Sequence, residues 1–172
     1  MKEVHCRLLD LPILHPRLLW ETIILAGASV LEGVDRRAPY TFLILAEDIP
    51  GFGSEELLLT IDPSGYDEES IVRLRRTFEF ARQVELAAIA VAALALALSG
   101  GHEIVDVALR GSAADYLVGD PPSRLEIAGR SRRTDLESAW QQKWNRLSLP
   151  SDQPGFVFVV EFETLTGRLG FA

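Results

Sequence analysis

The sequence predicts a single α+β or α/β domain, in which helices flank a mixed β-sheet. Three observations lead to this prediction. Of the 172 residues, 48% are hydrophobic, enough for one buried core in a chain of this length. Apolar residues recur with helical spacing in two long segments. Shorter aliphatic or alternating segments, which are typical of strands, lie before, between and after them.

Residues 1–66 are predicted to form a β-rich N-terminal extension of this domain. Apolar runs cover residues 19–30, 40–46 and 56–61, and the Pro-Gly-Phe-Gly turn at residues 50–53 separates the last two. We expect these runs to form the strands of a meander. Residues 8–19 carry no clear pattern.

A helix is predicted over residues 67–100, at the start of the core that spans residues 67–172. Its first turn, residues 67–69, is acidic, which suits a helix N-terminus. Residues 86–98 are apolar throughout, but this run is shorter than the roughly 20 residues that a membrane-spanning helix needs. We therefore expect a buried helix, at the centre of a sandwich or at a dimer interface, and no membrane contact.

Three strands, a helix and a last strand are predicted to follow. Aliphatic and β-branched residues favour strands at residues 103–109, 113–118 and 124–128. Thr134 and Glu137 have the spacing of a capping box, which predicts the start of the second helix. Its apolar stripe packs on the sheet and consists of Leu136, Trp140, Trp144 and Leu147. Alternation predicts the last strand at residues 155–164.

Two acidic residues lie on neighbouring predicted strands, Asp115 on the second and Glu126 on the third. The Gly-Asp-Pro-Pro turn at residues 119–122 should pair these strands as a hairpin and bring the carboxylates together. Magnesium prefers carboxylate oxygens and retains waters, one of which can attack a phosphodiester. We therefore expect Asp115 and Glu126 to be catalytic residues and ligands of Mg²⁺ or Mn²⁺.

The order helix, three strands, helix, strand, with Asp115 on the second strand and Glu-x-x from Glu126 on the third, resembles the core of the restriction-endonuclease-like, or PD-(D/E)XK, nuclease superfamily. The resemblance covers residues 67–172. It implies a nuclease that hydrolyses DNA or RNA phosphodiesters, in which the matching aspartate and glutamate hold one or two magnesium ions.

The sequence departs from this family two residues after Glu126. Ala128 stands where the family usually has a lysine that positions the attacking water, and alanine cannot orient water or offset charge on a phosphate. Arg130 or Lys143 could take over this role. The resemblance further allows a glutamine from the second helix and an acid from the first, for which the candidates are Gln141, Gln142, Glu79 and Glu85.

Other interpretations of the two carboxylates stay open. They could form surface ion pairs with Arg110, Arg124 or Arg130 and have no chemical role. The chain could also be a nuclease-fold protein that has lost catalysis and acts as a binding or assembly subunit. A third interpretation is a globular domain that only imitates the nuclease core and forms a packed oligomer.

The charge distribution bears on the partners. The net charge is −8, which disfavours general nucleic-acid binding, and residues 1–66 hold ten acidic and five basic residues. Residues 67–150 are nearly neutral, with twelve acidic and eleven basic residues, so local arginines could bind nucleic acid there. The acidic N-terminal region could bind another protein, cover a sheet edge or block the site. A homodimer is a further candidate assembly.

Cysteine usage and the N-terminal sequence predict a cytoplasmic location. Cys6 is the only cysteine, so no internal disulfide can form and a reducing compartment is expected. Polar residues and a proline interrupt the stretch where the core of a signal peptide would lie, namely Asp10, Pro12 and His15.

Overall fold

The computed structural model of the chain describes residues 1–108, 115–148 and 153–172. The described residues form one continuous eight-stranded mixed sheet, with strand order β1-β3-β2-β8-β7-β6-β5-β4. The strands are β1 (Lys2–Arg7), β2 (Tyr40–Glu47), β3 (Glu56–Asp62), β4 (Ile104–Val107), β5 (Tyr116–Val118), β6 (Ser123–Arg130), β7 (Gly155–Glu161) and β8 (Thr166–Phe171). The helices are α1 (Leu11–Leu14), α2 (Glu21–Glu32), α3 (Glu68–Thr77), α4 (Phe80–Gly100) and α5 (Leu136–Leu147).

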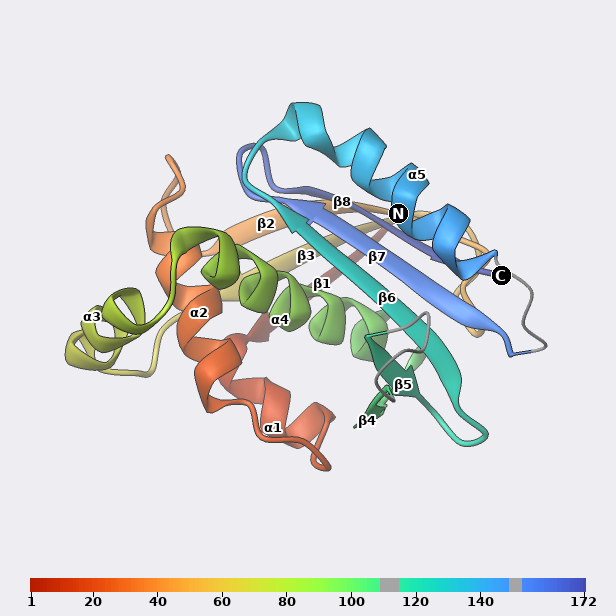
Figure 1. Ribbon diagram of the computed structural model, residues 1–172, viewed down its shortest axis with the longest axis horizontal. Coiled ribbons are helices and arrows are strands. Elements are labelled where there is room, and N and C mark those ends of the chain that lie inside the picture. Colours follow the sequence, from red (N-terminus) through yellow and green to blue (C-terminus); the bar gives the residue numbers. More distant parts are fainter. Residues whose placement is uncertain (109–114, 149–152) are drawn as a thin grey trace.

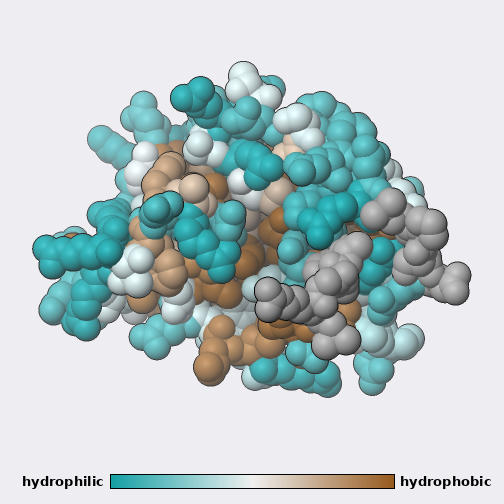
Figure 2. Space-filling model, viewed as in Figure 1, coloured by the Kyte–Doolittle hydropathy of each residue, from teal (hydrophilic) through white to brown (hydrophobic). Residues whose placement is uncertain are grey.

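Helices cover both faces of the sheet, as the prediction of a mixed sheet flanked by helices requires. Figure 1 shows α2 and α4 on one face and α5 on the other, lying along β6 and β7. The face with α2 and α4 carries the larger apolar core, whereas α5 encloses a smaller cluster with Val157 and Val159 of β7. In Figure 2, hydrophobic residues gather over the region of α2 and α4, and hydrophilic residues cover α5.

The N-terminal region differs from the predicted meander. Residues 40–46 and 56–61 do form antiparallel strands, β2 and β3, but most of the apolar run 19–30 forms α2. Ile24, Ala28 and Leu31 are buried at a helical spacing of four and three residues. The sheet begins instead with β1, which pairs in parallel with β3 and has no counterpart in the prediction.

The predicted helix over residues 67–100 is two helices. Phe78 and Glu79 have extended backbone conformations, with ψ angles of 138° and 153°, and they separate α3 from α4. The amide of Gln83 donates to the carbonyl of Phe78, and the hydroxyl of Ser29 on α2 donates to the amide oxygen of the same glutamine. These bonds hold the break in place and fix α3 and α4 against α2.

Helix α4 confirms the prediction of a buried apolar helix. By length and composition alone, Phe80–Gly100 could span a membrane, but 78% of its most apolar window is buried inside the protein. Such burial is typical of a core helix. Its alanines allow close packing: the side chain of Ala90 lies against Gly27 of α2, and Ala88 lies against Gly129 of β6.

The C-terminal half follows the predicted order of elements. Residues 104–107, 116–118 and 123–130 form the antiparallel strands β4, β5 and β6, whereas residues 109 and 113–114 of the predicted strands lie outside the described residues. After α5, β7 pairs in parallel with β6. The predicted strand 155–164 ends at Glu161, and a turn leads to β8, which the prediction lacked.

Helix α5 packs as predicted but begins differently. Trp140 and Leu147 are buried against the sheet, and Trp144 stacks on Trp140 with ring centroids 5.3 Å apart. The capping box of Thr134 and Glu137 is absent from the described residues, because Thr134 lies within a 3-10 turn. Glu137 instead pairs with Arg168 of β8 at 3.0 Å.

Candidate functional site

The β5–β6 hairpin brings the two predicted carboxylates together. Asp115 precedes β5, and its backbone N–H donates to the carbonyl of Leu125 at 2.8 Å. Its Oδ2 accepts the backbone N–H of Ile127, also at 2.8 Å. Two bonds thus fix Asp115 beside the middle of β6, next to the position of Glu126. This part of the sequence-based prediction is confirmed.

Two cationic side chains of α5 contact the buried Glu126. Glu126 has 0% side-chain exposure and lies on the face of β6 that α5 covers. Lys143 Nζ lies 2.8 Å from its Oε2 and 3.5 Å from Oδ2 of Asp115, and Arg146 Nε lies 3.2 Å from its Oε1. Lys143 is therefore shared by both carboxylates.

Neither Arg124 nor Arg130 pairs with the carboxylates in the described part of the chain, so this alternative is wrong for both. Arg110 lies outside the described residues. Arg124 donates to the backbone carbonyls of Leu147 and Gln153. Arg130 donates to the carbonyl of Gly129. The expectation of a surface pair also fails for Glu126, because α5 closes over it and supplies the cations.

Burial dominates the electrostatics of Glu126. Desolvation raises the pKa of this carboxyl, the hydrogen bond and positive charge of Lys143 oppose that rise, and the neighbouring Asp115 adds to it. Glu126 Oε1 is buried and accepts no hydrogen bond from the described residues, although Arg146 lies within ion-pair distance.

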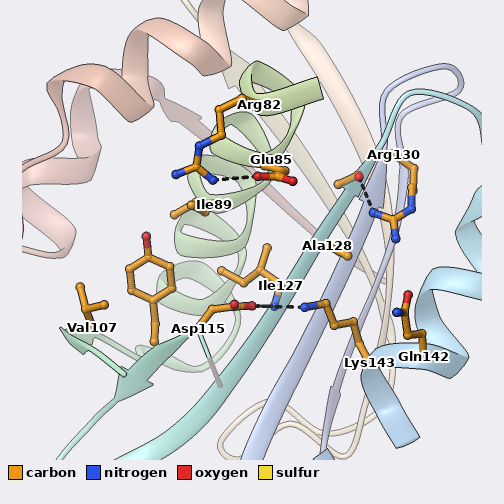
Figure 3. Close-up of a pocket in the computed structure, with 12 residues that line it drawn as sticks. Arg82, Glu85, Ile89, Val107, Asp115, Ile127, Ala128, Arg130, Gln142 and Lys143 are labelled. Carbon is orange, nitrogen blue, oxygen red and sulfur yellow. Dashed lines mark hydrogen bonds and ion pairs between the residues drawn. The ribbon is translucent and has the colours of Figure 1, made fainter. Parts of the chain in front are cut away.

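A pocket of about 440 Å³ opens beside the carboxylates, between α4, the edge of β6 and α5. Asp115 and Lys143 lie at one end of it in Figure 3. At the other end, Arg82 pairs with Glu85 at 2.7 Å and Arg130 projects from β6. The lining is completed by Ile89, Val107, Tyr116, Ile127, Ala128, Gly129 and Gln142.

The candidate substitutes for the missing lysine are placed differently by the structure. Lys143 contacts both carboxylates, whereas Arg130 lines the pocket and is bonded to the chain next to it. Of the two glutamines, Gln142 lines the pocket and Gln141 bonds to Glu137.

The two acids predicted on the first helix also lie in different environments. Glu85 lines the pocket, whereas Glu79 is exposed at the N-cap position of α4, where its side chain forms no capping bond. Arg146 was missed as a site residue. Its signal was present, because it follows Lys143 by three positions and so shares a helix face with it.

Asp115 and Glu126 provide only the small number of protein ligands that a hard divalent cation requires. No group of three or more His, Cys, Asp or Glu side chains in the described parts of the chain could hold a metal ion. Asp115 and Glu126 supply two carboxylates, and magnesium is commonly held by one or two carboxylates with water and substrate oxygens completing its shell. An ion held by both would share this space with the ammonium of Lys143.

No model of a known protein family matches this chain, and neither a curated protein nor a solved structure matches it. The function is therefore argued from the geometry of the pocket.

Proposed function

We propose that the chain is a divalent-metal-dependent nuclease of restriction-endonuclease-like fold, acting on phosphodiesters of DNA or RNA at the pocket beside Asp115. The observation that carries the proposal is the position of Lys143, whose Nζ lies within 3.5 Å of both carboxylates. In the nuclease superfamily that residues 67–172 resemble, an aspartate and a glutamate hold the metal and a lysine positions the attacking water. Here the lysine comes from α5 and not from β6.

Each of the three residues has a role in this proposal. Asp115 and Glu126 would hold Mg²⁺ or Mn²⁺, which supplies Lewis-acid activation of the phosphodiester. Asp115 is 39% exposed and is the ligand that faces the pocket, whereas the buried Glu126 is fixed by α5. Lys143 would orient the attacking water and offset negative charge developing on the phosphate.

The cations around the pocket make nucleic acid a reasonable substrate despite the net charge of −8. Arg82, Arg130 and Lys143 line it, and of these Arg130 forms no ion pair with a carboxylate in the described part of the chain. Phosphate binding depends on the local charge that faces the backbone, since contacts to phosphates supply most of the non-specific affinity.

The proposal is tested first by calorimetric titration of Mn²⁺ and Mg²⁺. We expect binding to the wild type that is lost in Asp115→Asn, and retained in Asp120→Asn, a matched change at the exposed turn of the same hairpin. Cleavage of labelled DNA and RNA is then measured with Mn²⁺, and we expect Asp115→Asn and Glu126→Gln to abolish it. Wild-type protein that binds neither ion would overturn the enzymatic proposal.

A second candidate function rests on the same ion pairs. Lys143 and Arg146 already balance the charge of Glu126 without any metal. This arrangement favours a nuclease-fold protein that lacks catalysis and serves as a binding or assembly subunit. Absence of both metal binding and cleavage in the wild type, with the fold intact, would favour this second function.

A further inference from the structure

Residues 127–130 of β6 line the pocket. Within residues 1–108, 115–148 and 153–172, β5 pairs with β6 between Ser123 and Leu125, whereas β7 pairs with the other edge as far as Arg130. The pocket-lining part of β6, residues 127–130, therefore lies beyond the end of β5. Asp115 lines the pocket next to this segment, where its Oδ2 accepts the backbone N–H of Ile127.

The wall of this pocket contains aliphatic side chains as well as charged ones. Ile89 of α4, Val107 of β4 and Ile127 of β6 contribute aliphatic side chains, and Figure 3 shows Ile89 and Ile127 between Arg82 at one end and Asp115 at the other. A volume of about 440 Å³ lies within the range of roughly 300 to 1,000 Å³ that encloses a small molecule. One nucleotide, with a flat base and an anionic phosphate, has matching chemistry.

Arg130 is the cation available to a second phosphate. Its guanidinium donates to the carbonyl of Gly129, and within residues 1–108, 115–148 and 153–172 it forms no ion pair with a carboxylate. Arg82 is paired with Glu85, which leaves that pair close to neutral. A phosphate at this end of the pocket would therefore interact with the guanidinium of Arg130.

We propose that the pocket holds one unpaired nucleotide next to the scissile phosphate, with Arg130 binding the neighbouring phosphate, so that the substrate is a single strand or a single-stranded end. The assignment of the scissile phosphate rests on the proposed function, whereas binding of the single strand does not require catalysis. A base inside a duplex is stacked on both faces and paired at its edge, so it must be extruded before it can enter a pocket. An unpaired base avoids that cost and can contact the ring of Tyr116 and the aliphatic side chains of the pocket.

The test is a binding measurement in EDTA, where metal-dependent cleavage cannot occur. Fluorescence anisotropy would compare a labelled mixed-sequence 12-nucleotide DNA, its RNA equivalent and the blunt DNA duplex of the same sequence. We expect either single strand to bind about tenfold or more tightly than the duplex, and Arg130→Gln to weaken that binding roughly tenfold. Arg132→Gln is the matched control, because Arg132 is exposed two residues further on and does not line the pocket.

The outcomes separate the two proposals. A duplex that binds as tightly as the single strand, or an Arg130→Gln variant that binds as the control does, would overturn the single-strand assignment even if cleavage is observed. Preferential binding that depends on Arg130, in a protein that never cleaves with Mn²⁺, would support the pocket assignment and overturn the nuclease. Lack of binding to every strand in EDTA would overturn the single-strand assignment, whereas the nuclease is judged by the metal titration and by cleavage with Mn²⁺. Thermal unfolding of each variant confirms that it is folded.

Discussion

Lys143 Nζ lies 2.8 Å from Oε2 of Glu126, although 17 positions separate the two residues in the sequence. The contact exists because α5 crosses back over β6 on its way to β7, which places one face of the helix above the acid. A lysine two positions after Glu126 would have reached the same face of β6 directly, because side chains alternate along a strand. The chain has Ala128 there and supplies the ammonium from the covering helix.

Loss of Lys143 should destabilise the fold because it leaves a buried charge poorly compensated. We expect Lys143→Met to lower the free energy of unfolding by about 3 kcal/mol, the lower end for a broken buried pair, since Arg146 still contacts Glu126. Urea unfolding measures this change. In a Glu126→Gln background the same substitution should cost less than about 1 kcal/mol. Equal costs in the two backgrounds would show that the ion pair is not the source of the effect.

Moving the lysine to β6 should restore cleavage that the loss of Lys143 abolishes. Lys143→Met should lower the metal-dependent rate by about 100-fold or more, as loss of one electrostatic stabiliser does. Ala128→Lys added to this variant should recover at least about tenfold, since Ala128 lines the pocket and shares the face of Glu126. Ala128→Met provides a control of similar size without charge. A double variant no more active than this control would argue against a catalytic role for the ammonium.

The parts of the fold that the sequence predicts well are those in which a local pattern and tertiary packing agree. β2 alternates buried and more exposed residues along its whole length, and the stripe that includes Trp140 has helical spacing, so both are read from periodicity. Most residues of the run 19–30 are apolar, because α2 packs between other elements. The run therefore has too few polar positions to show the period of a helix. β1 was missed for the opposite reason, since Cys6 is its only buried residue.

The site was predictable in part for a similar reason. A turn signal places Asp115 near Glu126 through local hairpin pairing, which is a short-range event. Lys143 required the position of α5 over β6, which depends on the packing of Trp140 and Leu147 and on the parallel pairing of β7. The break between α3 and α4 likewise depends on the bond from Ser29 of α2 to Gln83, 54 positions apart, for which no local residue pattern exists.

Close packing of α4 on β6 should make Gly129 intolerant of a side chain. A Cβ added there would lie 2.7 Å from the carbonyl oxygen of Val84 and 2.8 Å from Cβ of Ala88, so α4 or β6 must shift. We expect Gly129→Ala to lower the free energy of unfolding by about 1 to 3 kcal/mol. Gly33→Ala is the control, because its nearest neighbour lies at 3.4 Å and its backbone is helical. A similar small effect at both sites in urea unfolding would contradict this packing argument.

His15 should make the stability of the fold depend on pH. The imidazole is fully buried, its Nδ1 accepts the backbone N–H of Ile104 at 2.9 Å, and its Nε2 lies 2.7 Å from the carbonyl oxygen of Ala93. The ring is therefore neutral with its proton on Nε2, since a proton on Nδ1 would displace the bond from Ile104. Burial lowers the pKa of His15 in the folded protein, partly opposed by the Ala93 bond and the charge of Glu103.

The sign of the effect follows from that lowered pKa. The unfolded chain takes up the proton first, at a pKa of about 6.5, so the contribution of His15 is complete above this pH and is lost as the pH falls below it. We expect the unfolding free energy of wild type to fall relative to His15→Gln between about pH 8 and pH 5. Glutamine can keep a donor and an acceptor at this position without titrating. A difference between the two proteins that stays constant over this range would show that His15 is not protonated on unfolding.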